Sequence, residues 1–168
     1  MSSMFQWTNF NQDIGDWDVS SVTDMSRMFF DVDSFNQDLS NWNVSHVVYT
    51  DAMFSSASSF NQDIGGWDVS NVIDMGSMFY HADSFNQDLN DWNVSKVTKM
   101  LWMFGETNFN SSIDKWDVSS VRDMRYMFAG DTSFNQDIGD WDVSNVEEMS
   151  SMFFGACDFN QDLNGWNT

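Results

Sequence analysis

Residues 10–29, FNQDIGDWDVSSVTDMSRMF, recur along the whole chain with few changes. The next copy, residues 35–54, reads FNQDLSNWNVSHVVYTDAMF. The Phe-Asn pair that opens each copy occurs seven times, at Phe10, Phe35, Phe60, Phe85, Phe109, Phe134 and Phe159. Five of the six spacings are 25 residues and one is 24. Because self-similarity at a period of about 20–50 residues is typical of stacked-repeat proteins, the sequence predicts a solenoid.

The 168 residues form one solenoid domain in this interpretation, residues 1–168. Residues 1–9 match the tail of a preceding repeat, full repeats start at residues 10, 35, 60, 85, 109 and 134, and residues 159–168 begin a further repeat. Each coil of such a stack contacts only its neighbours. The apolar side chains of Phe5, Trp7 and Trp166 are therefore expected on uncapped ends, which predicts end-to-end self-association.

Two periodicities meet within each repeat. The apolar residues of its second half are spaced as on one face of a helix, at Val22, Met25, Met28 and Phe29. Ser20 precedes them as a good N-cap, so a helix of about two to three turns is expected. Trp17, Asp18 and Val19 alternate apolar and polar residues, which predicts a short strand. The predicted fold class is an α/β solenoid of the leucine-rich-repeat kind: about six to seven strand-helix coils with a short parallel sheet on one face.

The charge and composition of the chain narrow the range of partners. It carries 26 Asp and Glu against 6 Lys and Arg, a formal net charge of -20. A field of that sign repels phosphates and anionic headgroups, so nucleic acids are poor partners. No stretch approaches the ~18 continuous apolar residues of a membrane span, so no direct membrane insertion is expected. Cys157 is the single cysteine, which excludes an intramolecular disulfide, and we expect it to be buried.

The segments IGDWDVSSV and LSNWNVSHV, residues 14–22 and 39–47, match the leucine-rich-repeat frame with Trp and Val in two of the Leu positions. The full unit resembles the bacterial surface protein repeat of about 26 residues. That repeat is found in BspA-like leucine-rich-repeat surface proteins and in mycoplasma and Listeria lipoproteins. The resemblance covers essentially the whole chain. It implies a cell-surface or extracellular location and a role in interaction or adhesion.

Catalysis needs unlike residues that converge once, and the repeat pattern offers no such set. The two histidines, His46 and His81, stand at positions that vary between repeats, without a Ser or Cys partner set apart from the pattern. We therefore expect no enzyme activity, no catalytic residues and no cofactor. No segment has the spacing of an EF-hand loop, so no metal site is assigned. A cation-stabilised solenoid is an alternative, because acidic residues recur at the centre of the predicted strands.

Two polar rows follow the opening Phe of each repeat. One row holds Asn, beginning at Asn11, and the other holds Asp, beginning at Asp13. Such rows could form ligand arrays. Asn and Asp side chains also bond nearby backbone groups at turns, and a solenoid must form the same turn in every coil. We expect these rows to maintain the fold.

One stretch departs from the repeat and forms the predicted binding site. Five of the six basic residues fall within it, at Lys96, Lys99, Lys115, Arg122 and Arg125. Positions that hold small or acidic residues in other repeats here carry Leu101, Trp102 and Tyr126. Aromatic rings beside Lys and Arg are typical of interaction hot spots. The predicted binding residues are Lys99, Leu101, Trp102, Arg122, Arg125 and Tyr126.

Two interpretations of this stretch are open. The cations could merely neutralise neighbouring Asp rows while Trp102 and Tyr126 fold back over the next helix. If the stretch binds a ligand, an anionic glycan or an acidic protein is expected, with affinity that falls as salt rises. The sequence therefore predicts a non-catalytic interaction or adhesion module of a larger cell-surface protein that binds protein or glycan. The alternative is a structural spacer that presents another domain.

Overall fold

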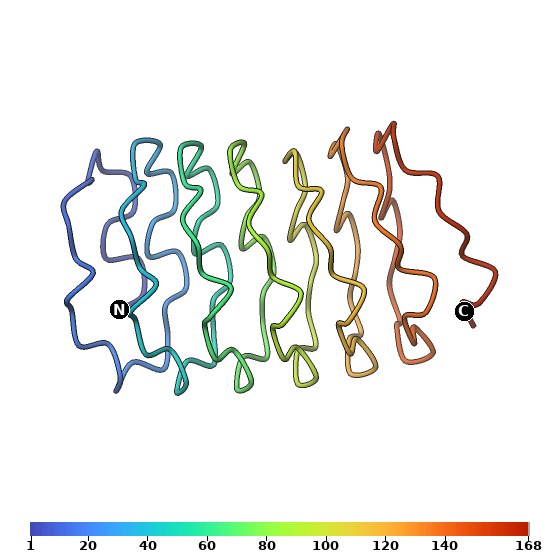
Figure 1. The fold of residues 1–168 in the computed structure, drawn as a ribbon, viewed down its shortest axis with the longest axis horizontal. Coiled ribbons are helices and arrows are strands. Elements are labelled where there is room, and N and C mark those ends of the chain that lie inside the picture. Colours follow the sequence, from blue (N-terminus) through green and yellow to red (C-terminus); the bar gives the residue numbers. More distant parts are fainter. Residues whose placement is uncertain (168) are drawn as a thin grey trace.

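The computed structural model describes residues 1–167 and shows an elongated stack of coils (Figure 1). The two termini lie at opposite ends of the long axis, and consecutive coils lie side by side along it. We number the coils one to six, at residues 10–34, 35–59, 60–84, 85–108, 109–133 and 134–158. The solenoid predicted from the repeat is confirmed.

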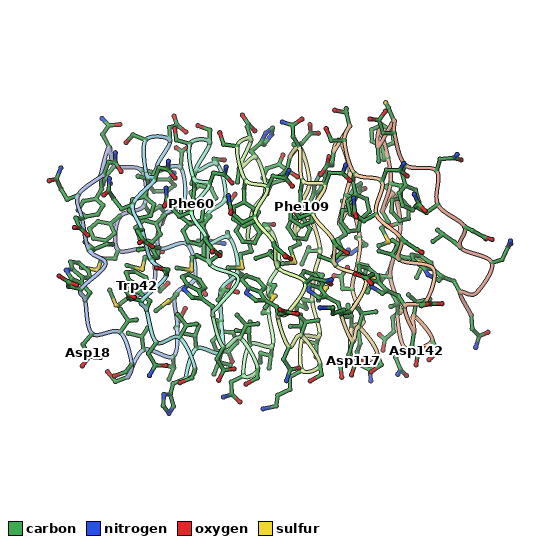
Figure 2. The ribbon with its side chains drawn as sticks, in the orientation of Figure 1. Asp18, Trp42, Phe60, Phe109, Asp117 and Asp142 are labelled. Carbon is green, nitrogen blue, oxygen red and sulfur yellow. The ribbon has the colours of Figure 1, made fainter. Side chains whose placement is uncertain are left out.

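Aromatic ladders run through the interior of the stack (Figure 2). Two Phe rings stack at each junction between coils, as in Phe54 of coil two and Phe60 of coil three, whose centroids are 3.9 Å apart. Phe54 also stacks on Phe79 of the next coil, with centroids 5.9 Å apart. A row of Trp rings runs beside them, with Trp42 and Trp67 6.4 Å apart. Because each ring packs between rings of adjacent coils, the core is continuous and no coil has a core of its own.

The predicted helix is wrong. Residues 1–167 contain no α-helix and no continuous strand, and isolated parallel β-bridges join the coils. In the segment expected to be helical, alternate N–H groups donate to carbonyl oxygens of coil two, from Met25, Arg27, Phe29 and Asp31. The N–H groups between them close turns within the coil, as from Met28 to the carbonyl oxygen of Met25 at 3.1 Å. The backbone is therefore satisfied without helical bonds.

The helix-like spacing of the apolar residues comes from two successive turns, residues 25–28 and 29–32. The ends of these turns are Met25, Met28, Phe29 and Val32, which are all buried. The third residue of each turn has positive φ, 56° at Arg27 and 57° at Asp31. Positive φ recurs at the same two positions in coils two to six, and the backbone hydrogen bond of the first turn recurs in each of them. Because L residues in a right-handed helix have negative φ, this segment cannot be a helix, although its period is the same.

The predicted strand at residues 17–19 is also wrong. Oδ1 of Asp18 accepts the N–H of Ser20 at 3.1 Å and its hydroxyl at 2.6 Å, so the segment is a turn closed by a side chain. Ser20 therefore caps no helix. The parallel bridges lie further along each coil, at Asp24, Tyr49, Asp74, Lys99, Asp123 and Glu148. The leucine-rich-repeat frame predicted strand pairing at residues 17–19, whereas the parallel bridge of this coil lies at Asp24.

Side-chain exposure corrects two further expectations. Cys157 is exposed rather than buried, and its Sγ lies 3.3 Å from the carbonyl oxygen of Gly155. Trp7 is exposed as predicted, whereas Phe5 and Trp166 are half-buried against the core. Over residues 1–167, no helix has the length and apolarity needed to cross a membrane.

Glycine at a positive-φ position of the turns should stabilise the stack. Ser77 has φ of 56°, a conformation that costs an L residue about 1 kcal/mol more than Gly. We expect Ser77→Gly to raise the free energy of unfolding by about 1 kcal/mol in urea denaturation. The control Ser77→Ala keeps the Cβ and should change it by less than about 0.5 kcal/mol. In a helix, Gly would instead be less stable than Ala by about 1 kcal/mol, and that order would contradict this architecture.

Candidate functional site

The Asn row is a hydrogen-bond ladder between coils. Oδ1 of Asn36 accepts the backbone N–H of Asn61 at 3.0 Å and Nε2 of Gln62 at 3.0 Å. The bond to the next Asn recurs at every step of the row, from Asn11 to Asn160. These oxygens serve backbone N–H groups of the following coil, so the row maintains the fold as predicted.

The acidic rows close turns in the same way. Oδ1 of Asp63 accepts the N–H of Gly65 at 3.0 Å, and Oδ1 of Asp68 accepts the N–H of Ser70 at 3.1 Å. Bonds from the side chain and backbone of Ser70 lower the pKa of Asp68. Figure 2 shows the row that includes Asp18, Asp117 and Asp142 along the lower edge of the stack. These carboxylates therefore have structural partners within the chain.

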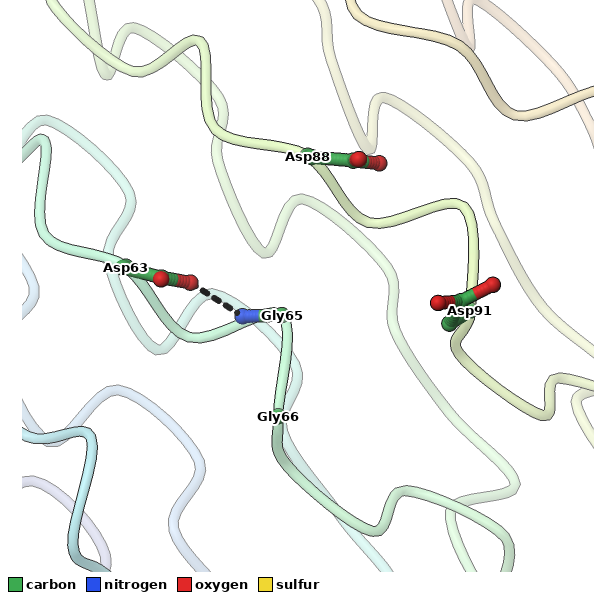
Figure 3. A pocket seen from close by; sticks show the side chains of 5 residues that line it. All are labelled: Asp63, Gly65, Gly66, Asp88 and Asp91. Carbon is green, nitrogen blue, oxygen red and sulfur yellow. Dashed lines mark hydrogen bonds between the residues drawn. The ribbon is translucent and has the colours of Figure 1, made fainter.

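A shallow hollow of about 290 Å³ lies among the acidic turns and is lined by Asp63, Gly65, Gly66, Asp88 and Asp91 (Figure 3). Asp63 is directed at the N–H of Gly65, and Asp88 accepts the backbone N–H two residues further on at 2.9 Å. Asp91 pairs with Lys115 at 2.8 Å. Within the described part of the chain, no three His, Cys, Asp or Glu side chains form a group that could hold a metal ion. The hollow is not a candidate site.

The stretch that departs from the repeat forms an aromatic cluster, which we define as Tyr80, Trp102 and Tyr126. The rings of Trp102 and Tyr126 stack with centroids 4.4 Å apart and planes 6° apart. The Tyr80 ring meets the Trp102 ring edge-on, with centroids 5.2 Å apart. A Cβ on Gly105 would collide with the Trp102 ring, so this glycine provides the space in which the ring lies. Three coils thus contribute one partly exposed aromatic surface.

The cluster arises where the turn geometry leaves a side chain free. Trp102 and Tyr126 have φ of 55° and 57° and occupy the first positive-φ position of their coils. Other coils fill this position with Arg27, Ala52, Ser77 and Ser151. The backbone N–H of Trp102 donates to the carbonyl oxygen of Arg125 in the next coil at 2.9 Å. The turn requires this bond of any residue at that position. The fold therefore fixes the backbone and leaves the choice of side chain open.

Each predicted cation of the site contacts an acid: Lys99 with Asp74 at 2.9 Å, Arg122 with Glu147 at 2.6 Å, and Arg125 with Asp123 at 2.7 Å. The hydrogen bond to Asp74 raises the pKa of Lys99, and the bond from Arg125 lowers the pKa of Asp123. Exposed pairs of this kind contribute about 0–1 kcal/mol each. The cations therefore have acidic partners within the chain. Trp102 lies over Gly105 of its own coil, and the expected fold-back over a next helix does not occur because that segment contains no helix.

The structure brings together only some of the six predicted residues. Trp102 and Tyr126 are in contact, with Arg125 next to Tyr126 in the chain. Leu101 lies over Gly76 of the preceding coil, where its Cδ2 would be 2.7 Å from an added Cβ. Tyr80 was missed because its position in the repeat also holds Phe30 and Phe154, so an aromatic residue there looked ordinary.

The two histidines lie apart on the surface. His46 is exposed in coil two. The ring of His81 meets that of Tyr80 with centroids 4.5 Å apart, and its Nδ1 lies 3.8 Å from Oδ1 of Asp83. Over residues 1–167, neither histidine is hydrogen-bonded to a Ser hydroxyl or to the thiol of Cys157. Their geometry is that of exposed surface residues.

A protein-family comparison identifies the repeat. The matching family is described as Mycoplasma protein of unknown function, DUF285, and its model matches residues 1–108 and again residues 90–168. The chain belongs to this family. The two overlapping matches cover the whole chain, as expected for a family defined by a repeat. No curated protein and no solved structure matches the chain.

Removing one step of the Asn ladder should destabilise the stack. Oδ1 of Asn61 accepts Asn86 N at 3.1 Å and Gln87 Nε2 at 2.8 Å. We expect Asn61→Ala to lower the free energy of unfolding by about 1–2 kcal/mol, because the N–H of Asn86 loses its acceptor and Gln87 Nε2 keeps only the backbone carbonyl oxygen of residue 61. The control Asn61→Asp retains an acceptor oxygen and should cost less than Asn61→Ala. Urea denaturation measures both, and an unchanged stability of Asn61→Ala would contradict a structural role for the row.

Proposed function

We propose that this chain is a non-catalytic interaction module that binds a neutral glycan through the aromatic cluster. The observation that carries the proposal is the stacked pair Trp102 and Tyr126, 4.4 Å apart on the outer surface. The polar rows serve the fold itself, whereas these rings make no contribution that the turn requires. Large partly exposed rings supply contact area at a low cost in conformational entropy, which is typical of binding surfaces.

The charge around the cluster favours a neutral ligand over the anionic one expected from sequence. Arg125 lies next to Tyr126, but it makes two hydrogen bonds to the carboxylate of Asp123, at 2.9 and 2.7 Å. Lys99 makes one hydrogen bond to Asp74, at 2.9 Å. An anion would have to displace these carboxylates and approach a chain of net charge -20. Sugar rings present flat C–H faces that pack on aromatic rings, and their hydroxyls can bond to such ion pairs.

A place in a larger cell-surface protein is part of the proposal. Its support is the resemblance of the repeat to those of bacterial surface proteins and mycoplasma lipoproteins, and stacked repeats commonly present extended binding surfaces. Protease treatment of intact cells that make the protein tests this location. Digestion without lysis is expected, and full protection until lysis would contradict it.

A structural spacer is the second candidate. The observation that favours it is the uniformity of the stack, in which the Asn and Asp rows are used for turns and ladders. A spacer needs no exposed rings, however, and Gly105 would have no reason to leave room for Trp102.

Displacing the Trp102 ring should weaken glycan binding without removing any residue of the cluster. Gly105→Ala places a Cβ in the space of that ring. An array of chitohexaose, maltohexaose and heparin identifies the best neutral probe, and calorimetry then gives its Kd. We expect Gly105→Ala to raise this Kd about tenfold, equivalent to about 1.4 kcal/mol. In the matched control Gly66→Ala, the added Cβ meets nothing within 4 Å, and Kd should not change.

The double variant Trp102→Ser and Tyr126→Ser introduces the residue that other coils hold at Ser77 and Ser151. It should abolish binding while thermal unfolding stays cooperative. Undiminished binding by this variant would contradict the cluster as the site. Failure of the intact chain to bind any probe favours the spacer, and salt-sensitive binding of heparin alone favours an anionic ligand.

A further inference from the structure

Coil four is one residue shorter than its neighbours, and side chains replace the missing backbone. Phe85 follows Phe79 by six residues, whereas Phe109 follows Phe104 by five. In coil three, the N–H of Ser84 donates to the carbonyl oxygen of Ser58 in the preceding coil at 3.2 Å. In coil four, Nδ2 of Asn108 donates to the carbonyl oxygen of Asp83 instead, also at 3.2 Å. The deletion therefore leaves backbone groups that side chains must satisfy.

In coil five, the side chain of Asp131 likewise accepts hydrogen bonds from backbone N–H groups. Its position in the other coils holds Val32, Ala57, Ala82, Thr107 and Ala156. Asp131 is completely buried, and its Oδ1 accepts the N–H groups of Ser133 at 3.0 Å and Phe134 at 3.1 Å. Its Oδ2 lies 2.8 Å from Oγ1 of Thr107, in the shortened connector of coil four. A buried acid thus joins coils four and five. At the same position the other coils hold an apolar residue, except coil four, which holds Thr107.

Counting hydrogens at Thr107 indicates where the proton lies. Its Oγ1 is 2.7 Å from the carbonyl oxygen of Phe104 and 2.8 Å from Oδ2 of Asp131, yet a hydroxyl carries one hydrogen. The same short connector occurs at Thr8, whose hydroxyl donates to Phe5 O at 2.7 Å. With the Thr107 hydrogen used in that way, its bond to Asp131 requires a hydrogen on the carboxyl group.

The surroundings of Asp131 also favour the neutral form. Asp131 takes part in none of the ion pairs of residues 1–167. The nearest charged residues in the flanking connectors are Glu106 and Asp158, which are acidic and exposed. Glu106 extends over Gly130, where its carboxylate would meet an added Cβ. Burial raises the pKa of Asp131 to about 6, against the N–H bonds from Ser133 and Phe134 that lower it; a Thr107 hydroxyl that donated to the carboxyl group would lower it further.

We propose that Thr107 and Asp131 form a proton-operated joint between coils four and five. The protonated carboxyl donates to the Thr107 hydroxyl, which donates to Phe104, so every polar atom of the joint is paired. When the proton leaves, the buried carboxylate has no cation beside it and competes with Phe104 for the single Thr107 hydrogen. The contact between Thr107 and Asp131 therefore stabilises the stack at mildly acidic pH and contributes less stability at neutral pH.

The sign of the pH dependence follows from the direction of the shift. The pKa of Asp131 in the folded chain lies above its ordinary value of 3.8, so the folded state holds the proton more tightly. The stability that Asp131 contributes is complete below about pH 4 and is lost as the pH rises through about 6. Asp18 and Asp68 act in the opposite sense, because their pKa values are lowered. The effect of Asp131 must therefore be measured against a matched variant.

Asp131→Asn reproduces the protonated acid at every pH, because its amide can donate to Thr107 and its oxygen can accept from Ser133 and Phe134. We expect the unfolding equilibrium constant of the natural chain, divided by that of the variant, to rise on the order of 100-fold between pH 4 and pH 7. Urea denaturation at each pH gives both constants. The control Asp158→Asn removes the same charge from an exposed position and should leave the ratio flat. A flat ratio for Asp131→Asn, or an equal rise for the control, would overturn the proposal.

A direct titration keeps the test decisive if Asp131→Asn does not fold. Carbon-13 NMR of the natural chain follows the Cγ resonance of Asp131 against pH. A midpoint near 6 supports the joint, and a midpoint below about 4, the ordinary range of Asp, overturns it.

Discussion

Backbone hydrogen bonds between neighbouring coils are the interaction on which this structure depends. Alternate N–H groups of each turn segment donate to the next coil, while the groups between them close turns within the coil. An isolated coil would leave half of this segment unpaired, so the stack is the smallest unit that satisfies the backbone. The aromatic rows follow the same rule. Nε1 of Trp67, for example, donates to the carbonyl oxygen of Leu39 in the preceding coil at 3.0 Å.

This constraint decides where function can reside. Side chains such as Asn36 and Asp63 are committed to ladders and turns, so they are unavailable as ligands without cost to the fold. The first positive-φ position is different, because the turn fixes its N–H and carbonyl groups and uses no atom of its side chain. Trp102 and Tyr126 use that freedom. They also join coils four and five, the same two coils that Thr107 and Asp131 join.

The polar rows and part of the candidate site could be predicted from the sequence. A residue that recurs in every coil, such as Asn11, must serve something that every coil shares, and the ladder is that shared need. Trp102 and Tyr126 stood out because they break the repeat. Tyr80 did not stand out, since Phe30 holds the same position. Asp131 was overlooked among 26 Asp and Glu, although the apolar residues at its position in most other coils, such as Val32, were the signal that could have found it.

The period of the repeat by itself determined that the chain is a solenoid, because only stacking buries the same apolar positions in every copy. The tertiary structure alone decided what each coil is made of. Two turns of four residues give Met25, Met28, Phe29 and Val32 the spacing of a helix, so the pattern cannot separate the two. Neighbouring coils separate them. The N–H of Arg27 finds its acceptor in coil two, and Arg27 adopts positive φ to reach it, which no local pattern encodes.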